Sequence, residues 1–166
     1  MQDSIRFSLV GVTTEQFAKI FEPEVEENIE LNISINVNSN YQNGAIAVTP
    51  KISFGESEKP FLILESTCHF KVEPSDWDRI SDSGNVDVTV PKYVIMNMVS
   101  IALGTCRGIL HTKTENTEYN KYYLPLIRPL RCCLRMRRIV WYGLNSVCIC
   151  YVILLYMWAL SLESCC

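Results

Sequence analysis

Histidine is scarce in this sequence, and the common catalytic motifs are absent from it. Only two of the 166 residues, His69 and His111, are histidines. Because His69 directly follows Cys68, the two side chains would point to opposite faces of a strand and cannot share a metal ion. We find no Gly-x-Ser-x-Gly motif, no phosphate-binding glycine loop and no zinc-ligand spacing. The sequence therefore predicts no catalytic residues, no metal site, no cofactor and no enzymatic activity.

Basic residues are too few in the first 128 residues for a nucleic-acid-binding surface. This part contains 11 lysines and arginines against 17 aspartates and glutamates, a formal charge of −6. Contacts to phosphate groups require a basic surface. The composition therefore argues against nucleic acid as a partner.

Cysteine is also scarce in residues 1–128, where only Cys68 and Cys106 occur. The first four residues lack the basic start of a secretory signal peptide, and no apolar run follows them. Both features are typical of a cytoplasmic protein with reduced thiols. We expect residues 1–128 to form one cytoplasmic domain, since this length suffices for a single hydrophobic core.

An alternating stretch at residues 28–38 predicts the strand around which the rest of the chain packs. Polar residues separate five aliphatic ones, which are Ile29, Leu31, Ile33, Ile35 and Val37. Side chains along a strand alternate between its two faces, so this strand has one apolar face and one solvated face. A half-solvated strand is typical of an antiparallel sheet.

Three further strands are predicted. Asn43-Gly44 indicates a hairpin, and the return strand that follows it contains Pro50, which favours an edge position or a bulge. The return strand has its apolar face at Ile46, Val48, Ile52 and Phe54. Strands at residues 5–12 and 61–73 complete a four-stranded antiparallel sheet.

Between the first two strands the sequence predicts a helical turn or a loop at residues 14–21. Thr13 and Gln16 form a capping-box pattern, and apolar residues follow at helical spacing. We interpret residues 22–27 as an acidic connector, because Pro23 and the repeated glutamates disfavour a helix. A further helical turn is expected at residues 74–80.

Pro91 begins the long helical pattern of the domain, at about residues 92–110. One face of this helix consists of Ile95, Met98, Val99, Ala102 and Cys106. So few polar positions indicate a helix that is buried on more than one side. Because the sheet covers only one side, we expect a second copy of the chain on another. The predicted oligomer interface comprises Tyr93, Met96, Val99 and Leu103. The expected fold class is α+β, a four-stranded antiparallel sheet with one long packed helix.

Residues 129–166 differ abruptly in composition from residues 1–128. They contain four arginines, one glutamate and six of the eight cysteines, and residues 139–160 carry no charge. As a helix, this uncharged run would extend about 33 Å, enough to cross a bilayer. Arginines before it and aromatic residues near its ends favour a membrane anchor with the domain on the cytoplasmic side. A shifted reading frame would also produce such a tail, and an ordinary buried helix is the third interpretation.

Three short sequence features follow one another along and after the predicted long helix. Met98-Val99-Ser100 lies within it, Arg107-Gly108 lies near its end, and Leu124-Pro125-Leu126 follows a polar loop. In this combination the region from Pro91 to Pro125 resembles the long-helix region of SecB-like protein-export chaperones. The predicted strands and a crossover at residues 17–27 fit the same layout, so the resemblance covers about residues 5–127.

The resemblance implies a homotetramer, a dimer of dimers with the long helix packed between dimers, and no cofactor. It also implies an ATP-independent holdase for unfolded polypeptides. In the export branch of the family the clients are unfolded preproteins, which are delivered to the export motor ATPase. In another branch the client is the antitoxin of a toxin–antitoxin system. The family normally ends with a second helix that helps to frame the client groove, and here the tail takes that position.

Apolar residues on the crossover and on the later loop are the candidates for client binding, because an unfolded chain is captured by exposed apolar surface. They are Phe17, Ile20, Phe21, Tyr119, Tyr122 and Tyr123. Core packing is the alternative interpretation for the phenylalanines. Glu30 and Glu65 are candidates to face a basic partner, with a solvated surface as the alternative. The competing function is a membrane-anchored accessory protein whose sheet docks one folded partner, with a membrane involved only if the tail is a true anchor.

Overall fold

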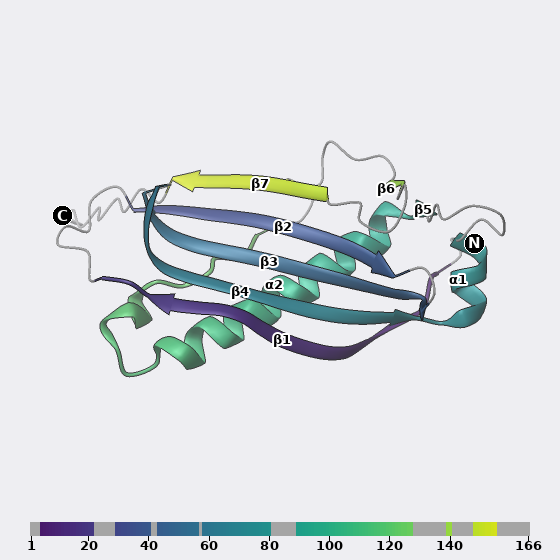
Figure 1. Cartoon of the computed structure of the whole chain (residues 1–166), viewed down its shortest axis with the longest axis horizontal. Helices are drawn as coiled ribbons and strands as arrows, with labels where there is room; N and C mark the ends of the chain where they lie inside the picture. Colours follow the sequence, from purple (N-terminus) through teal and green to yellow (C-terminus); the bar gives the residue numbers. More distant parts are fainter. Residues whose placement is uncertain are drawn as a thin grey trace, which may run out of the picture.

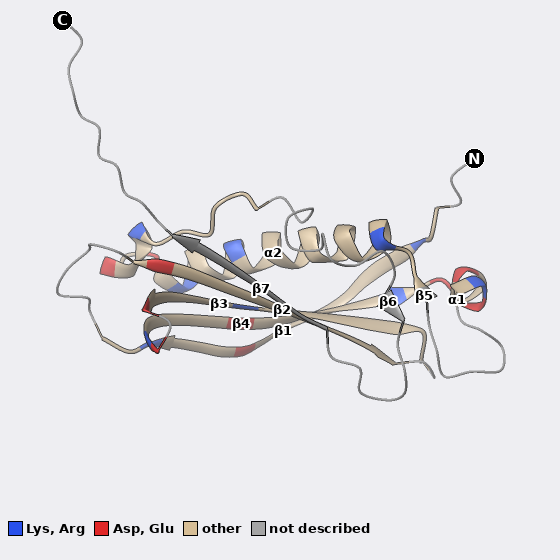
Figure 2. Cartoon of the chain, turned by 90° about the horizontal axis from the view of Figure 1, so that it is seen from above, with Lys and Arg blue, Asp and Glu red and all other residues tan. Residues whose placement is uncertain are grey.

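The computed structural model describes residues 4–21, 29–40, 43–56, 58–80, 89–127, 139–140 and 148–155. These residues form an α+β fold in which an antiparallel sheet carries one long helix, α2 (Lys92–Thr114), on one of its faces. Figure 2 shows the two layers from above, with α2 lying over the sheet. The four-stranded sheet and long packed helix that the sequence predicts are confirmed.

The main sheet has the strand order β1-β4-β3-β2-β7, and every neighbouring pair is antiparallel. Its strands are β1 (Phe7–Lys19), β2 (Glu30–Asn40), β3 (Ala45–Glu56), β4 (Lys59–Val72) and β7 (Cys148–Leu155). Consecutive hairpins join β2, β3 and β4, whereas β1 crosses over to pair with β4 (Figure 1). Strands β2, β3 and β4 therefore form a meander, and β1 lies beside β4 instead of β2.

The alternation in β2 and β3 produces the core face of the sheet. The aliphatic residues of both strands are buried under α2, and their polar neighbours lie on the opposite face. The hairpin between them contains Gly44 at φ +57°, a left-handed conformation that favours glycine. A Cβ atom at this position would lie 3.3 Å from the ring of Trp77, so the close approach of that ring is a second reason for glycine here.

Pro50 lies in an interior strand, which corrects the expected edge position or bulge. β3 is flanked by β2 and β4, and the register with β2 continues without a shift through Ile35 and Pro50. The pairing of β3 with β4 stops after Val48 and resumes at Lys51, because Pro50 has no N–H to donate to the neighbouring strand. A hydroxyl–hydroxyl bond of 3.0 Å between Thr49 and Thr67 joins the two strands at this gap.

The helical turn predicted at residues 14–21 is wrong, because β1 continues as a strand to Lys19. Two register shifts interrupt its pairing with β4, one between Leu9 and Gly11 and one between Thr14 and Gln16. Each shift changes the phase of the alternation, so the apolar residues of this strand acquire a helix-like spacing. The Thr13 hydroxyl donates to the Glu15 carboxylate at 2.6 Å and caps no helix.

Both helices that follow β4 form at the predicted positions. The short α1 (Pro74–Ile80) places Trp77 in the core. The longer α2 begins after Pro91 and extends four residues beyond its predicted end, to Thr114. Its predicted core face is buried against the sheet. By length and apolar composition, α2 alone among the described helices could cross a membrane, but nearly half of it is buried within the fold.

The described tail residues form strands, which corrects the helix predicted at residues 139–160. β6 (Ile139–Val140) pairs with β5 (Thr89–Val90), and β7 pairs with β2 over its whole length. An uninterrupted apolar run has no period that distinguishes a helix from a strand. The sequence of β7, Cys-Ile-Cys-Tyr-Val-Ile-Leu-Leu, is rich in β-branched and aromatic residues, and β2 offers it an open edge.

Candidate functional site

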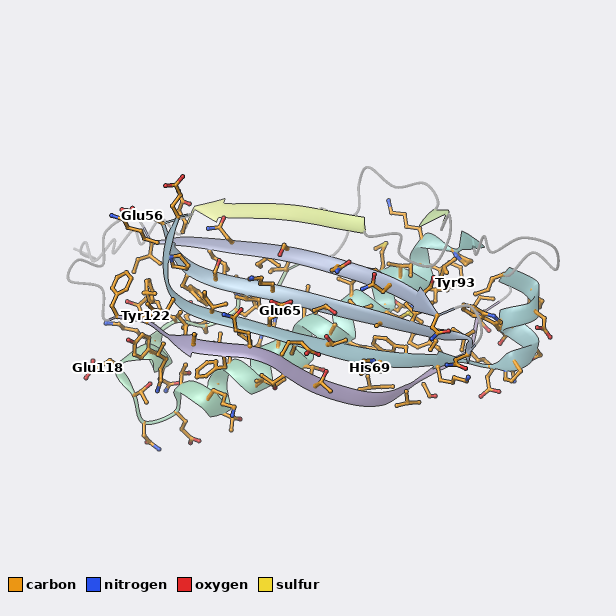
Figure 3. The ribbon with its side chains drawn as sticks, viewed as in Figure 1. Glu56, Glu65, His69, Tyr93, Glu118 and Tyr122 are labelled. Atoms are coloured by element: carbon orange, nitrogen blue, oxygen red, sulfur yellow. The ribbon has the colours of Figure 1, made fainter. Side chains whose placement is uncertain are left out.

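Aromatic rings from three parts of the chain meet at one end of the sheet. Phe61 lies at the centre, with its ring centroid 4.8 Å from that of Tyr122 and 6.3 Å from those of both Phe21 and Tyr119. Phe54 joins through Tyr122 at 5.8 Å. We call Phe21, Phe54, Phe61, Tyr119 and Tyr122 the aromatic cluster. Figure 3 shows Tyr122 and Glu118 at this end of the molecule and Tyr93 at the other.

Backbone hydrogen bonds bring the end of β1 to this cluster. Lys19 pairs with Leu62, and one residue later the Ile20 N–H donates to the Phe61 carbonyl at 2.8 Å. This bond continues the strand pairing beyond β1, so Phe21 lies beside the Phe61 ring in an edge-on arrangement. The extended pairing of β1 with β4 therefore brings Ile20 and Phe21 to the cluster, although these residues are not helical.

A tight turn after α2 returns the chain to the same end. Asn116 has a φ of +59°, and the Thr117 hydroxyl donates to the Thr114 carbonyl at 2.7 Å. Thr117 also caps the 3-10 helix η2 (Glu118–Lys121) by accepting a bond from the Tyr119 N–H at 3.3 Å. This turn places the Tyr119 ring against Phe61.

Arg107 holds the segment that follows η2 against α2. Its Nε donates to the Leu124 carbonyl at 2.8 Å, and its Nη2 donates to the Pro125 carbonyl at 2.9 Å. Leu124 is fully buried as a result of this return path, whereas Tyr123 and Leu126 point outward with 58% and 85% exposure. One arginine thus fixes the backbone that presents these exposed side chains.

The exposed part of the site is apolar, and two lysines lie beside its tyrosine rings. Ile20 and Phe21 are 54% and 46% exposed. The ammonium groups of Lys19 and Lys121 lie 5.6 Å and 5.4 Å from the ring centroids of Tyr119 and Tyr122. Such cation–π contacts keep the lysine charge beside the aromatic surface.

The structure brings four of the six residues predicted for client binding to Phe61, and Tyr123 directly follows one of them in the sequence. Ile20, Phe21 and Tyr123 are exposed, Tyr122 is half-buried, and Tyr119 is buried. Phe17 is half-buried and packs on the core further along β1, in line with the alternative interpretation of this phenylalanine. Sequence reasoning missed Phe54, Phe61 and Leu126. Phe61 begins an apolar run, but nothing local in the sequence indicates that it is the centre of a cluster.

The two acidic candidates lie apart from each other on the sheet. Glu65 forms an ion pair with Lys51 at 3.5 Å on the face opposite α2, in the middle of the strands (Figure 3). Glu30 begins β2, beside Leu155 of β7. Their proposed role toward a basic partner remains a prediction.

The four residues predicted for an oligomer interface differ in burial. Val99 and Leu103 are buried in the core of a single chain, while Tyr93 and Met96 are half-buried. Ile101, which the prediction did not include, is exposed on α2. Contact between two copies through this helix remains a prediction.

Two cysteines, Cys68 and Cys106, are buried between α2 and the sheet. The Cys106 thiol and the Ser66 hydroxyl lie 3.0 Å apart in the buried layer. Burial raises the pKa of Cys106 to about 11 and outweighs the opposing effect of that hydrogen bond. Burial also raises the pKa of Cys68. Both cysteines are thus protonated at neutral pH, and thiolate chemistry is disfavoured at both. Within the described part of the chain, no three histidine, cysteine or acidic side chains are placed to hold a metal ion.

Known proteins resemble this chain only weakly. No protein-family model matches the chain, and no curated protein matches its sequence. A solved structure with a similar arrangement is the Mycobacterium tuberculosis SecB-like chaperone Rv1957 in complex with a ChAD peptide from the antitoxin HigA1. It has a TM-score of 0.42 and 11% sequence identity, and the match covers 75% of this chain and 90% of that chain. This level of similarity is too low for an inference about function.

Proposed function

We propose that this chain is an ATP-independent chaperone that binds unfolded polypeptides on the exposed edge of its aromatic cluster. The observation that carries the proposal is the exposure of Ile20, Phe21 and Tyr123 around a buried aromatic floor. Soluble proteins rarely expose neighbouring large apolar side chains unless the surface binds something.

The geometry suits a binding partner without a fixed shape. Aromatic rings offer large contact areas at a small loss of side-chain entropy, and they accept many apolar side chains. The Ile20–Phe61 hydrogen bond and the bonds from Arg107 to the Leu124 and Pro125 carbonyls fix the backbone beside the exposed rings, so these rings need little rearrangement on binding. Preorganisation of this kind increases affinity without adding contacts.

The finer features of the proposal rest on the sequence resemblance to SecB-like chaperones. We propose a cytoplasmic homotetramer, a dimer of dimers, that receives either unfolded preproteins for the export motor ATPase or an antitoxin. Sedimentation equilibrium of the full chain tests the assembly, and a monomer at high concentration would reject it. The membrane-anchored alternative requires a spanning helix at residues 139–160, whereas residues 148–155 of that run form the strand β7.

An aggregation assay tests the binding surface. We expect the full chain to suppress aggregation of a chemically unfolded protein without ATP, and the double variant Phe21→Ser/Tyr123→Ser to lose most of this suppression. Val10→Ser is the matched control, because Val10 is exposed on β1 away from the pairing of Ile20 with Phe61. Equal suppression by all three proteins, or none by the wild type, would reject the proposal.

A further inference from the structure

The two long edges of the domain's own four strands differ in how they are protected. β1 contains two bulges, and bulges disrupt the regular row of backbone groups that another strand needs for pairing. β2 contains none in its pairing with either neighbour. Its sequence, Glu-Leu-Asn-Ile-Ser-Ile-Asn-Val-Asn-Ser-Asn, has no proline, glycine or lysine. β2 therefore lacks the usual protections of an edge strand.

The tail of this same chain occupies the unprotected edge. β7 pairs with β2 over eight consecutive residues, from Glu30 with Leu155 to Val37 with Cys148, without a register shift (Figure 1). Among the described elements, β7 contacts β2 extensively and no other. β7 is thus attached to the domain mainly through one strand ladder.

β7 belongs to the same chain as the domain. Residues 141–147 lie between β6, which pairs with β5, and the start of β7. A strand tethered in this way competes with free ligands at an effective concentration on the order of millimolar. A free peptide at micromolar concentration would therefore displace it only poorly.

We propose that the free edge of β2 is a strand-accepting site, and that residues 148–155 occupy it as an autoinhibitory strand. The occupant that replaces β7 is an extended apolar segment of another polypeptide, which pairs through its backbone. The choice of an unfolded polypeptide as competitor rests on the proposed function. The pairing of β7 with β2 does not, and it is tested separately.

A peptide-binding experiment on the full chain tests the competition. The probe is a fluorescein-labelled peptide with the sequence of β7, serine in place of both cysteines and two lysines at each end. The variant Tyr151→Pro/Val152→Pro weakens β7. Because successive N–H groups of a strand point to opposite edges, one of the two lost donors must face β2. Leu160→Pro/Ser161→Pro, after β7 in the sequence, is the matched control.

We expect the β7 variant to bind the probe at least tenfold more tightly than the wild type or the control variant, by fluorescence anisotropy. The same peptide with prolines at its two central positions should bind none of the three proteins. Equal affinity of the wild type and the β7 variant for the probe would overturn the proposal.

Amide hydrogen exchange within β2 gives a readout that does not depend on client binding. Alternate N–H groups of β2 face β3 and β7, so in the wild type both sets should exchange slowly. In the β7 variant, the set facing β7 should exchange at least tenfold faster while the set facing β3 stays slow. Fast exchange of the set facing β7 in the wild type would overturn the proposal even if the variant failed to fold. Protection in the wild type would stand even if the aggregation assay showed no chaperone activity.

Discussion

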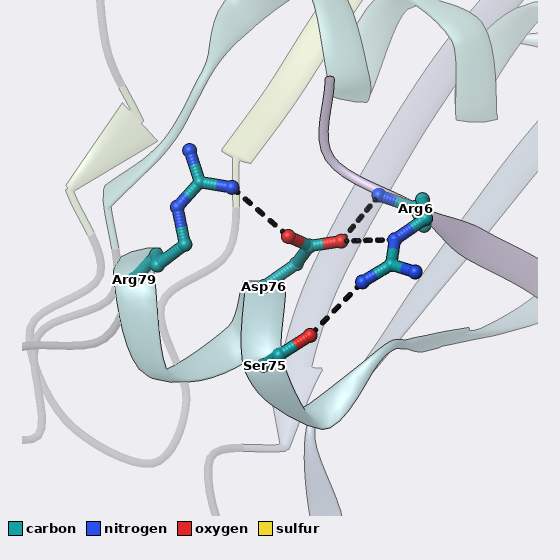
Figure 4. Close-up of polar contacts among 4 residues, drawn as sticks. All are labelled: Arg6, Ser75, Asp76 and Arg79. Carbon is teal, nitrogen blue, oxygen red and sulfur yellow. Dashed lines mark hydrogen bonds and ion pairs between the residues drawn. The ribbon is translucent and has the colours of Figure 1, made fainter. Parts of the chain in front are cut away.

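At the scale of single residues, one buried carboxylate fixes the start of β1. Asp76 of α1 is only 3% exposed, and its Oδ2 accepts bonds of 3.0 Å from both the backbone N–H and the Nε of Arg6. Its Oδ1 accepts a further bond of 3.0 Å from Arg79, and Arg6 also donates to Ser75 (Figure 4). Residues 70 positions apart in the sequence are thus joined at one side chain.

These bonds make the stability contribution of Asp76 depend on pH. The backbone N–H of Arg6, and then its guanidinium group, hold the pKa of the Asp76 carboxyl below its ordinary value. Because the pKa of Asp76 is lower in the folded state, this carboxylate contributes fully to the free energy of unfolding above its ordinary pKa of about 4. This contribution is lost as the pH falls from there through the lowered pKa of the folded state.

We expect Asp76→Asn to lower the melting temperature by several degrees at pH 7, and by less below the folded-state pKa. Thermal unfolding by circular dichroism at several pH values measures both effects. Asp78→Asn is the matched control, because Asp78 is exposed on the same helix. An equal loss of stability in the two variants at pH 7 would contradict this account of the buried carboxylate.

At the scale of elements, the reliability of the sequence prediction follows the clarity of the hydrophobic period. β2 and β3 were predicted because apolar and polar residues alternate along them, and α2 was predicted because its apolar residues recur at helical spacing. β1 was misread because two bulges change its phase, and β7 was misread because an apolar run has no period. In β3, the prediction for Pro50 failed because side-chain hydroxyls join the strands where the ladder is interrupted.

The candidate site was predictable only in part, for a related reason. The exposed apolar residues near the end of β1 and after η2 can be identified from local sequence. Their meeting at Phe61 depends on the pairing of β1 with β4 and on the turn at Asn116. Both are long-range or conformational features that local patterns do not encode.

The segment after η2 gives a prediction at this scale. Arg107→Gln removes the charged donor to the Leu124 and Pro125 carbonyls, so we expect a loss of roughly 1–3 kcal/mol in the free energy of unfolding. Chemical denaturation measures the loss, and faster amide exchange at residues 122–127 should accompany it.

Lys113→Gln on the same helix is the control for Arg107→Gln, because Lys113 is exposed near the end of α2. Unchanged exchange at residues 122–127 in Arg107→Gln would show that this arginine does not hold the segment.

At the scale of the whole molecule, the chain combines an acidic domain with a tail of different composition, and β7 joins the tail to the domain's sheet. Whether a shifted reading frame produced residues 129–166 stays a prediction. Translation of the adjacent DNA in the other two frames tests it. If neither frame continues the domain beyond Ile127 with acidic, soluble sequence, that interpretation is wrong.

The central claim is that unfolded polypeptides bind at the exposed edge of the aromatic cluster, and site-specific photo-crosslinking tests it most directly. A photoreactive phenylalanine analogue is placed at Phe21, at Tyr123 or, as a control, at Val10, and each full chain is illuminated with a labelled unfolded protein. We predict strong crosslinks from positions 21 and 123, and weak ones from position 10 and with the folded form of the client. Crosslinks of equal yield at all three positions, or none at 21 and 123, would contradict the claim.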